Sequence, residues 1–154
     1  MNKKAQFYVI TAVILLALTY GFFRPKLVYA RDTSFEGLYK NYIEESPIAA
    51  NSGNLDDFSR RFVNYADTKI PNFGLAYLYV QNGNITVLNL VKKTIFINDV
   101  PLGFNQSAVI DQKNRTTLTL ESEQYVFETS EYPKVLSFFY AESEGSKKVY
   151  VKNE

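Results

Sequence analysis

The chain has 154 residues, with 17 Lys and Arg against 16 Asp and Glu, and it contains no Cys and no His. This length allows one domain with a hydrophobic core of ordinary size. The lack of Cys excludes disulfides and thiolate chemistry, and the lack of His excludes imidazole ligands and Ser-His-Asp catalysis. A near-neutral charge gives no long-range attraction to nucleic acid. We therefore expect a non-enzymatic protein that uses no metal or cofactor.

The clearest pattern in the sequence is an apolar segment near the N-terminus. A basic start, Met1 to Lys4, precedes a run without charges from Phe7 to Phe23, which stops at Arg24-Pro25-Lys26. A membrane-spanning helix needs about 17–25 apolar residues, and aromatic side chains near both ends favour the membrane–water boundary. The run predicts a transmembrane helix over 7–23. A helix buried in a soluble core is the alternative interpretation.

The orientation of this helix depends on weaker signals. Basic residues flank the run on both sides, so the positive-inside rule gives nearly equal weight to both orientations. The tail before the helix is short, which favours an N-terminus inside and a large domain outside. Three N-x-[ST] sequons, at Asn84, Asn105 and Asn114, permit an exterior location. We expect a single-pass protein of the cell membrane with its C-terminal domain extracytoplasmic.

Two processing events compete with a permanent anchor. Val28-Tyr29-Ala30 has small residues at the spacing that signal peptidases cut, although charges interrupt the stretch before it. The other pattern is Lys3-Lys4-Ala5-Gln6-Phe7, in which a basic pair and a small residue precede a Gln that opens the apolar helix. This arrangement resembles the class III signal peptide of archaeal type IV pilin-like proteins.

The resemblance implies a specific maturation and assembly. A prepilin peptidase would cut between Ala5 and Gln6 on the cytoplasmic side and leave the hydrophobic helix on the mature protein. Those helices would pack together in a surface filament, with the remaining domains forming the outer shell. The chain departs from the family pattern at Ile10, where many pilins carry Glu. The stretch Pro71-Asn72-Phe73-Gly74 is similar to one in archaeal membrane-anchored proteins that share the KK-[AG]-QF start.

A helical stem with two amphipathic helices is expected over 24–71. Thr33 to Glu36 matches an S/T-x-x-E capping box, which predicts Thr33 as the N-cap of the first helix. Apolar residues then recur at helical spacing until Pro47, where the helix is expected to end. Residues 49–53 resemble a connector.

The second helix is expected to begin at Asn54 as N-cap. Asp56–Arg60 and Asp57–Arg61 form i,i+4 pairs that predict an exposed outer side. The side chains expected to face the core are Leu55, Phe58, Phe62, Tyr65 and Ala66.

From about residue 72 the pattern changes to short alternating segments typical of strands. Asn82-Gly83 between two apolar segments is the strongest short hairpin signal. Turn-like stretches, including 99–103, separate the later segments. The sequence predicts an α+β chain whose residues 72–154 form an antiparallel β-sandwich-like domain. The expected strands cover 75–81, 84–91, 94–97, 108–111, 116–121, 124–128, 135–140 and 148–151.

Candidate chemical groups are few. The adjacent carboxylates Glu44-Glu45 and Asp56-Asp57 lie on predicted helix ends, where solvated charge is a better interpretation than acid–base work. No glycine-rich phosphate loop is present in the sequence. Neighbouring residues on a strand face opposite sides. Some rings in the run Phe138-Phe139-Tyr140 are therefore expected to point outward as a possible protein interface.

These patterns lead to two functional hypotheses. The first is a pilin-like structural subunit of a surface filament or adhesin, which contacts the bilayer and associates with itself through the N-terminal helix or with other surface proteins. The second is a single-pass anchored binding module or accessory subunit that never assembles into filaments. Neither hypothesis involves nucleic acid, and an enzyme is the least favoured class.

Overall fold

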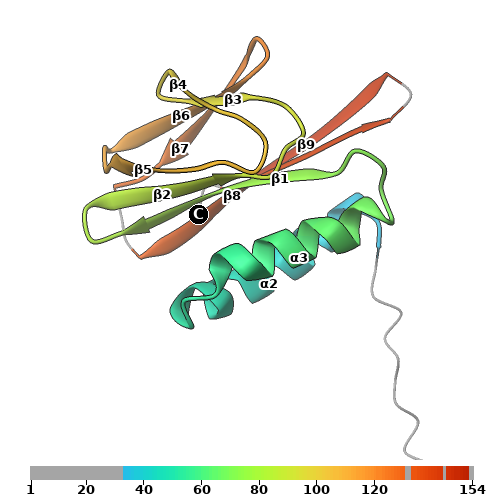
Figure 1. The fold of residues 1–154 in the computed structure, drawn as a ribbon, viewed down its shortest axis with the longest axis horizontal. Coiled ribbons are helices and arrows are strands. Elements are labelled where there is room, and N and C mark those ends of the chain that lie inside the picture. The colour runs from blue at the N-terminus through green and yellow to red at the C-terminus, as the bar shows by residue number, and fades with distance from the viewer. Residues whose placement is uncertain (1–32, 131–132, 144, 153–154) are drawn as a thin grey trace, which may run out of the picture. The chain divides into compact units, whose positions relative to one another are not determined.

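The computed structural model describes residues 33–130, 133–143 and 145–152 (Figure 1). These residues belong to one compact unit, Asp32–Glu154. The expected cleavage between Ala5 and Gln6, the membrane helix from Phe7 to Phe23 and the cleavage after Ala30 lie outside the described residues. Within the described ranges, no helix has both the length and the apolar character that crossing a membrane requires.

Helix α2 spans Phe35–Asn51 and begins one residue later than the sequence suggested. Ser34 is the N-cap, because its backbone is extended (φ −61°, ψ 160°) and its side chain accepts a hydrogen bond from the Gly37 N–H at 3.0 Å. The prediction of Thr33 as N-cap is therefore wrong. The helix also continues through Pro47, so the predicted end at Pro47 is wrong as well. Pro47 therefore lies inside the helix, and Ala50 is buried beyond it.

Helix α3 spans Leu55–Asp67 with Asn54 as N-cap, as expected. It packs against α2. Of the two predicted i,i+4 pairs, Asp57–Arg61 forms. Asp56 instead accepts a hydrogen bond from the Tyr77 hydroxyl of the adjacent sheet. Tyr65 was expected to face the core, but it is 39% exposed, and Ser59 and Val63 are buried in the interior of the helix face.

A five-stranded antiparallel sheet, which we call sheet A, lies beside the two helices (Figure 1). Its order is β5-β2-β1-β8-β9. The hairpin predicted at Asn82-Gly83 joins β1 to β2, and both turn residues have positive φ (52° and 80°). The strands span Gly74–Gln81 (β1), Asn84–Asn89 (β2), Ser107–Asp111 (β5), Lys134–Ser143 (β8) and Ser146–Lys152 (β9).

A four-stranded antiparallel sheet, sheet B, covers the other face of sheet A (Figure 1). Strand β4 was predicted as a turn, and that prediction is wrong. Asn98 and Asp99 both have positive φ (46° and 70°), so they form the tight turn themselves, and the three residues after it pair with β3. The eight expected strands are all present. The order is β4-β3-β6-β7, with β3 Ile95–Ile97, β4 Val100–Leu102, β6 Arg115–Leu120 and β7 Glu123–Glu128.

Two separate cores result from this arrangement. The helix–sheet core lies between the helices and sheet A, and the inter-sheet core lies between sheets A and B. Alternation along β1 supplies both, since Leu75 and Tyr77 face the helices while Ala76 and Leu78 face sheet B. Because the helices share a core with sheet A, the boundary expected at residue 72 does not separate a stem from a β domain.

Candidate functional site

The aromatic run Phe138-Phe139-Tyr140 is not an exposed interface. The three side chains are 0%, 0% and 3% exposed. They lie on β8, a central strand with the helices over one face and sheet B over the other. The expectation that some of these rings point outward is wrong, because it assumed that sheet A has one face in water.

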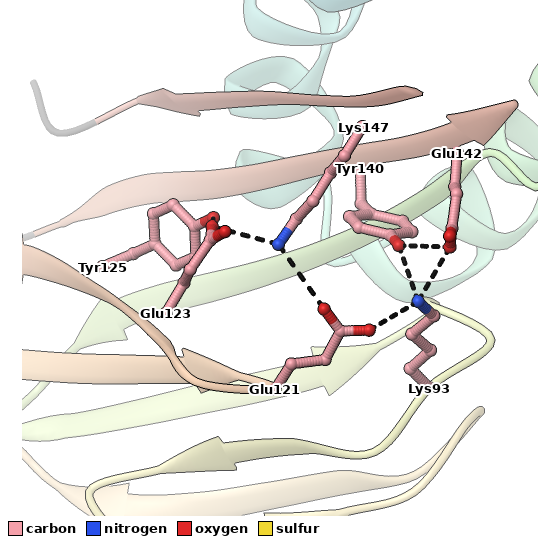
Figure 2. Close-up of polar contacts among 7 residues, drawn as sticks. All are labelled: Lys93, Glu121, Glu123, Tyr125, Tyr140, Glu142 and Lys147. Carbon is pink, nitrogen blue, oxygen red and sulfur yellow. Dashed lines mark hydrogen bonds and ion pairs between the residues drawn. The ribbon is translucent and has the colours of Figure 1, made fainter. Parts of the chain in front are cut away.

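The densest group of charged side chains in the described residues lies where one end of sheet A meets sheet B (Figure 2). We call it the polar network. It draws on the β2–β3 connection, the β6–β7 hairpin and the β8–β9 hairpin. Its members are Lys93, Glu121, Glu123, Tyr125, Tyr140, Glu142 and Lys147.

Lys93 is the centre of one half of the network. Its Nζ donates to Glu121 Oε1 at 2.7 Å, to the Tyr140 hydroxyl at 2.8 Å and to Glu142 Oε2 at 2.8 Å. The backbone that carries Lys93 is held by the buried Asn89, whose Nδ2 donates to the Lys93 carbonyl at 2.9 Å. A fixed backbone therefore aims one ammonium group at acceptors from both sheets.

Lys147 is the centre of the other half. Its Nζ lies 3.0 Å from Glu123 Oε2 and 3.7 Å from Glu121 Oε2. The Tyr125 hydroxyl donates to the same Glu123 oxygen. Glu121, which adopts a positive φ of 57° in the β6–β7 turn, thus bridges the two lysines. The network ties the two sheets together at this end of the molecule.

The pKa shifts of Lys93, Tyr140 and Glu142 all favour the form that each group has at neutral pH. The hydrogen bonds to Glu121 and then Glu142 raise the pKa of Lys93. The hydrogen bond from Lys93 lowers the pKa of Glu142, and burial raises the pKa of Tyr140. Since each shift strengthens the form already present at pH 7, these groups are poorly placed to exchange a proton in acid–base catalysis.

Of the adjacent carboxylates named from the sequence, the pair Asp56-Asp57 engages in structural contacts. Asp57 Oδ1 accepts from Arg61 Nε at 3.2 Å, on the exposed side of α3. Asp56 accepts from Tyr77, whose pKa is raised by burial and by this hydrogen bond. Within the described part of the chain, no three His, Cys, Asp or Glu residues are grouped closely enough to hold a metal ion.

A shallow groove of about 480 Å³ lies between the end of α2 and the start of α3. Ile48, which is 71% exposed, forms part of its wall with Phe58, and Glu45, Asp57 and Arg61 supply charges. No buried polar side chain that lacks a partner lines this groove. The groove therefore adds apolar surface without a defined chemical site.

Sequence reasoning did not find the polar network. Lys93 is 28 residues from Glu121 and 49 residues from Glu142 along the chain. The only local signal was the alternation of Glu121, Glu123 and Tyr125, which places three polar groups on one side of a hairpin. Which lysines meet them depends on how the two sheets pack.

Comparison of the chain with protein-family models, with curated proteins and with solved structures gave no match. The functional argument therefore starts from the geometry of this chain alone.

Proposed function

We propose that the chain is a non-enzymatic, membrane-anchored extracytoplasmic protein whose described residues form a sandwich-like binding head. The apolar run from Phe7 to Phe23 is its anchor. The head presents protein-binding surface on the outer side of the membrane. It belongs to the class of anchored modules and accessory subunits.

The N-cap of α2 is the observation that carries this proposal. Ser34 has extended backbone angles, and its hydroxyl caps a new helix. A residue in that conformation cannot lie inside a continuous α-helix. The head therefore begins with a helix of its own, and the described residues of both cores all follow Ser34. A compact unit of this kind suits a module on a tether.

The polar network supports the non-enzymatic part of the proposal. Its lysines are paired with carboxylates, and their charges serve to join the two sheets. General bases are usually tuned so that their pKa lies close to the working pH. The pKa of Lys93 is shifted away from neutrality, which favours a structural role.

A pilin-like filament subunit is the second candidate. It is favoured by the stretch Lys3-Lys4-Ala5-Gln6 before the apolar run. In this candidate, Gln6 would be the first residue of the mature chain.

Fractionation and labelling of the full chain test the first candidate. We expect the chain to stay with washed membranes and the exposed lysines of the head to react with a membrane-impermeant reagent added to intact cells. The double variant Ile14→Arg, Leu16→Arg should release the chain from the membrane, because each Arg at the centre of a spanning helix costs about 3 kcal/mol. The matched control Ile14→Leu, Leu16→Ile should stay bound.

Other results of these experiments distinguish the anchored module from the pilin-like subunit. A head that is labelled only after cell lysis would contradict the proposal. N-terminal sequencing that finds Gln6 first, together with recovery of the chain in sheared surface filaments, would replace the anchored module with the pilin-like subunit. An intact Met1 in washed membranes would support the anchored module.

A further inference from the structure

Edge strands differ in how well they are protected against pairing with another chain. An edge exposes unpaired N–H and C=O groups, and proteins protect it with charges, Pro or short length. In the described residues, sheet B ends at β4, which contains Pro101, and at β7, which begins and ends with Glu. Sheet A ends at β9, which carries Lys147, Lys148 and Lys152.

Strand β5, the other edge of sheet A, contains no Pro and no charge before its last residue. Its sequence is Ser-Ala-Val-Ile-Asp, with one charge at its last residue. Ala108 and Ile110 pack against the inter-sheet core, so the strand is held firmly on sheet A. Val109 is 67% exposed, the highest value for a large apolar side chain on any described strand.

The backbone groups of β5 that point to the free side can be identified. Asn89 N–H donates to the Gln106 carbonyl, and Gln112 N–H donates to the Gly83 carbonyl, both at 2.9 Å. In an antiparallel pair, residues that bond to the neighbour alternate with residues that bond to the other side. Because Gln106 and Gln112 bond toward β2, the N–H and C=O groups of Ser107, Val109 and Asp111 point away from sheet A.

We propose that β5 pairs with β5 of a second copy of this chain, antiparallel and centred on Val109. In this register Val109 lies opposite Val109 of the second copy, and Ser107 lies opposite Asp111. All three free-edge residues then fall in hydrogen-bonded pairs, which gives about six N–H···O bonds. The two copies form one continuous sheet from two five-stranded sheets A.

The side chains of β5 suit this register. The pairing covers the exposed Val109 with its own copy, and aliphatic cross-strand pairs stabilise antiparallel strands. Each Asp111 carboxylate lies opposite a Ser107 hydroxyl that can donate to it. The two carboxylates lie at opposite ends of the pair, so they do not repel each other directly. The same surface serves both copies, as a two-fold interface requires.

The inference rests on the proposed function in one respect, since it names the partner of the anchored head as a second copy of itself. Anchoring two heads in one membrane raises their effective concentration, which helps a small interface to form. The pairing can be measured on purified chain in detergent as well as in membranes. Its failure is therefore distinguishable from failure of the membrane assignment.

Single-cysteine variants test the register, because the chain contains no Cys. In a hydrogen-bonded antiparallel pair the Cα atoms are about 5.5 Å apart, which lies in the range that a disulfide spans. Val109→Cys is expected to give a disulfide-linked dimer under mild oxidation of the full chain. Val126→Cys is the matched control, because Val126 is 46% exposed on β7.

Two further variants make the test specific to antiparallel pairing. Ser107→Cys mixed with Asp111→Cys should cross-link, whereas each of these variants alone should not, since identical residues would be about 14 Å apart. Val109→Lys added to the mixed pair should lower the dimer yield at least tenfold, because two ammonium groups then lie opposite each other. Val109→Thr, the control, should keep the yield.

The proposal is overturned if Val109→Cys gives no more dimer than Val126→Cys. It is also overturned if Ser107→Cys cross-links with itself as well as it does with Asp111→Cys. Far-UV circular dichroism of each variant checks that the head is folded, and the exposure of these side chains makes retention of the fold the expected result.

Discussion

The two cores of the molecule are filled in different ways. The helix–sheet core contains a connected set of rings, and the ring centroids of successive neighbours lie 5.1–6.2 Å apart. The inter-sheet core is mostly aliphatic, with branched side chains such as Ile85, Val87 and Ile95. The members of the ring set are Tyr42, Phe62, Phe73 and Phe139, with Tyr39 and Phe35 in contact with it.

The two kinds of core use side chains with different packing properties. A ring buries about 150–250 Å² and has few rotatable bonds, so a small number of rings can fill the space between two helices and a sheet. β-branched side chains fit two sheets that face each other. Within the described residues, most Phe and Tyr side chains lie in or against these two cores and need no functional explanation.

The largest expected effect is removal of a ring from the helix–sheet core. Phe139→Ala should lower the free energy of unfolding by about 3–5 kcal/mol, because it leaves a cavity among Tyr39, Tyr42 and Phe73. Urea unfolding measures the loss. Ile95→Val in the inter-sheet core is the comparison and should cost about 0.5–1.5 kcal/mol. Equal losses from the two variants would contradict the distinction between the cores.

The second prediction adds a methyl group instead of removing a ring. A Cβ on Gly74 would lie 2.8 Å from the Val91 Cα, so β1 must move against the inter-sheet core. Gly74→Ala should cost about 1–3 kcal/mol. Gly103→Ala is the control and should cost less, since its Cβ would meet only the flexible side chain of Gln106. A tolerated Gly74→Ala would show that the inter-sheet core is loosely packed.

The third prediction concerns the polar end of a buried ring. Tyr42→Phe removes the hydrogen bond between the Tyr42 hydroxyl and Ser59 Oγ (2.8 Å) and should cost about 1–2 kcal/mol. Tyr42→Phe combined with Ser59→Ala should recover part of the lost stability, because neither hydroxyl of the pair is then left without its partner. Denaturant unfolding at neutral pH distinguishes the two variants.

Tyr42→Phe should also change how the stability of the fold depends on pH in alkaline solution. Burial raises the pKa of Tyr42, so the folded state keeps this proton when the unfolded state has lost it. The stability that the group contributes is complete below about pH 10 and declines as the pH rises further. Tyr42→Phe should therefore show a shallower alkaline decline than the parent chain. An identical decline would show that this hydroxyl does not couple to folding.

The smallest effect is expected at the polar network, away from both cores. Lys93→Met should cost at most about 1 kcal/mol at pH 7, because the ion pairs are open to solvent. Lys93 lowers the pKa of Glu142 from its ordinary value of 4.5. The stability that this ion pair contributes is therefore complete above pH 4.5 and is lost as the pH falls below it. The variant should lose less stability in acid than the parent. Lys113→Met, in the exposed β5–β6 turn, is the control.

Local chemistry made part of this fold predictable. The Asn82-Gly83 turn and the two strands that flank it depend on neighbouring residues, and both predictions are confirmed. Pro47 shows the limit of local rules, because α2 continues past it to Asn51 although Pro inside a helix is intrinsically costly. The turn at Asn98-Asp99 was missed because both residues adopt positive φ without a glycine.

The remaining errors come from contacts between distant parts of the chain. Nothing near Phe138 indicates that β8 enters sheet A beside β1, and that position is what buries both of its faces. The members of the polar network are also far apart in the sequence, so their contacts depend on how distant segments pack. Alternation along a strand tells which residues share a face, but the packing of whole sheets decides which faces meet water.

The position of β8 also bears on when the fold can be completed during synthesis. Gly74 pairs with Tyr140, so one side of β1 lacks its neighbour until the last part of the chain has emerged. Phe139 completes the helix–sheet core and Phe138 completes the inter-sheet core. A chain that stops before Lys134 has both helices and strands β1 to β7, but it lacks the side chains that β8 supplies to each core. The described unit therefore depends on a strand far along the chain to complete its central sheet and both of its cores.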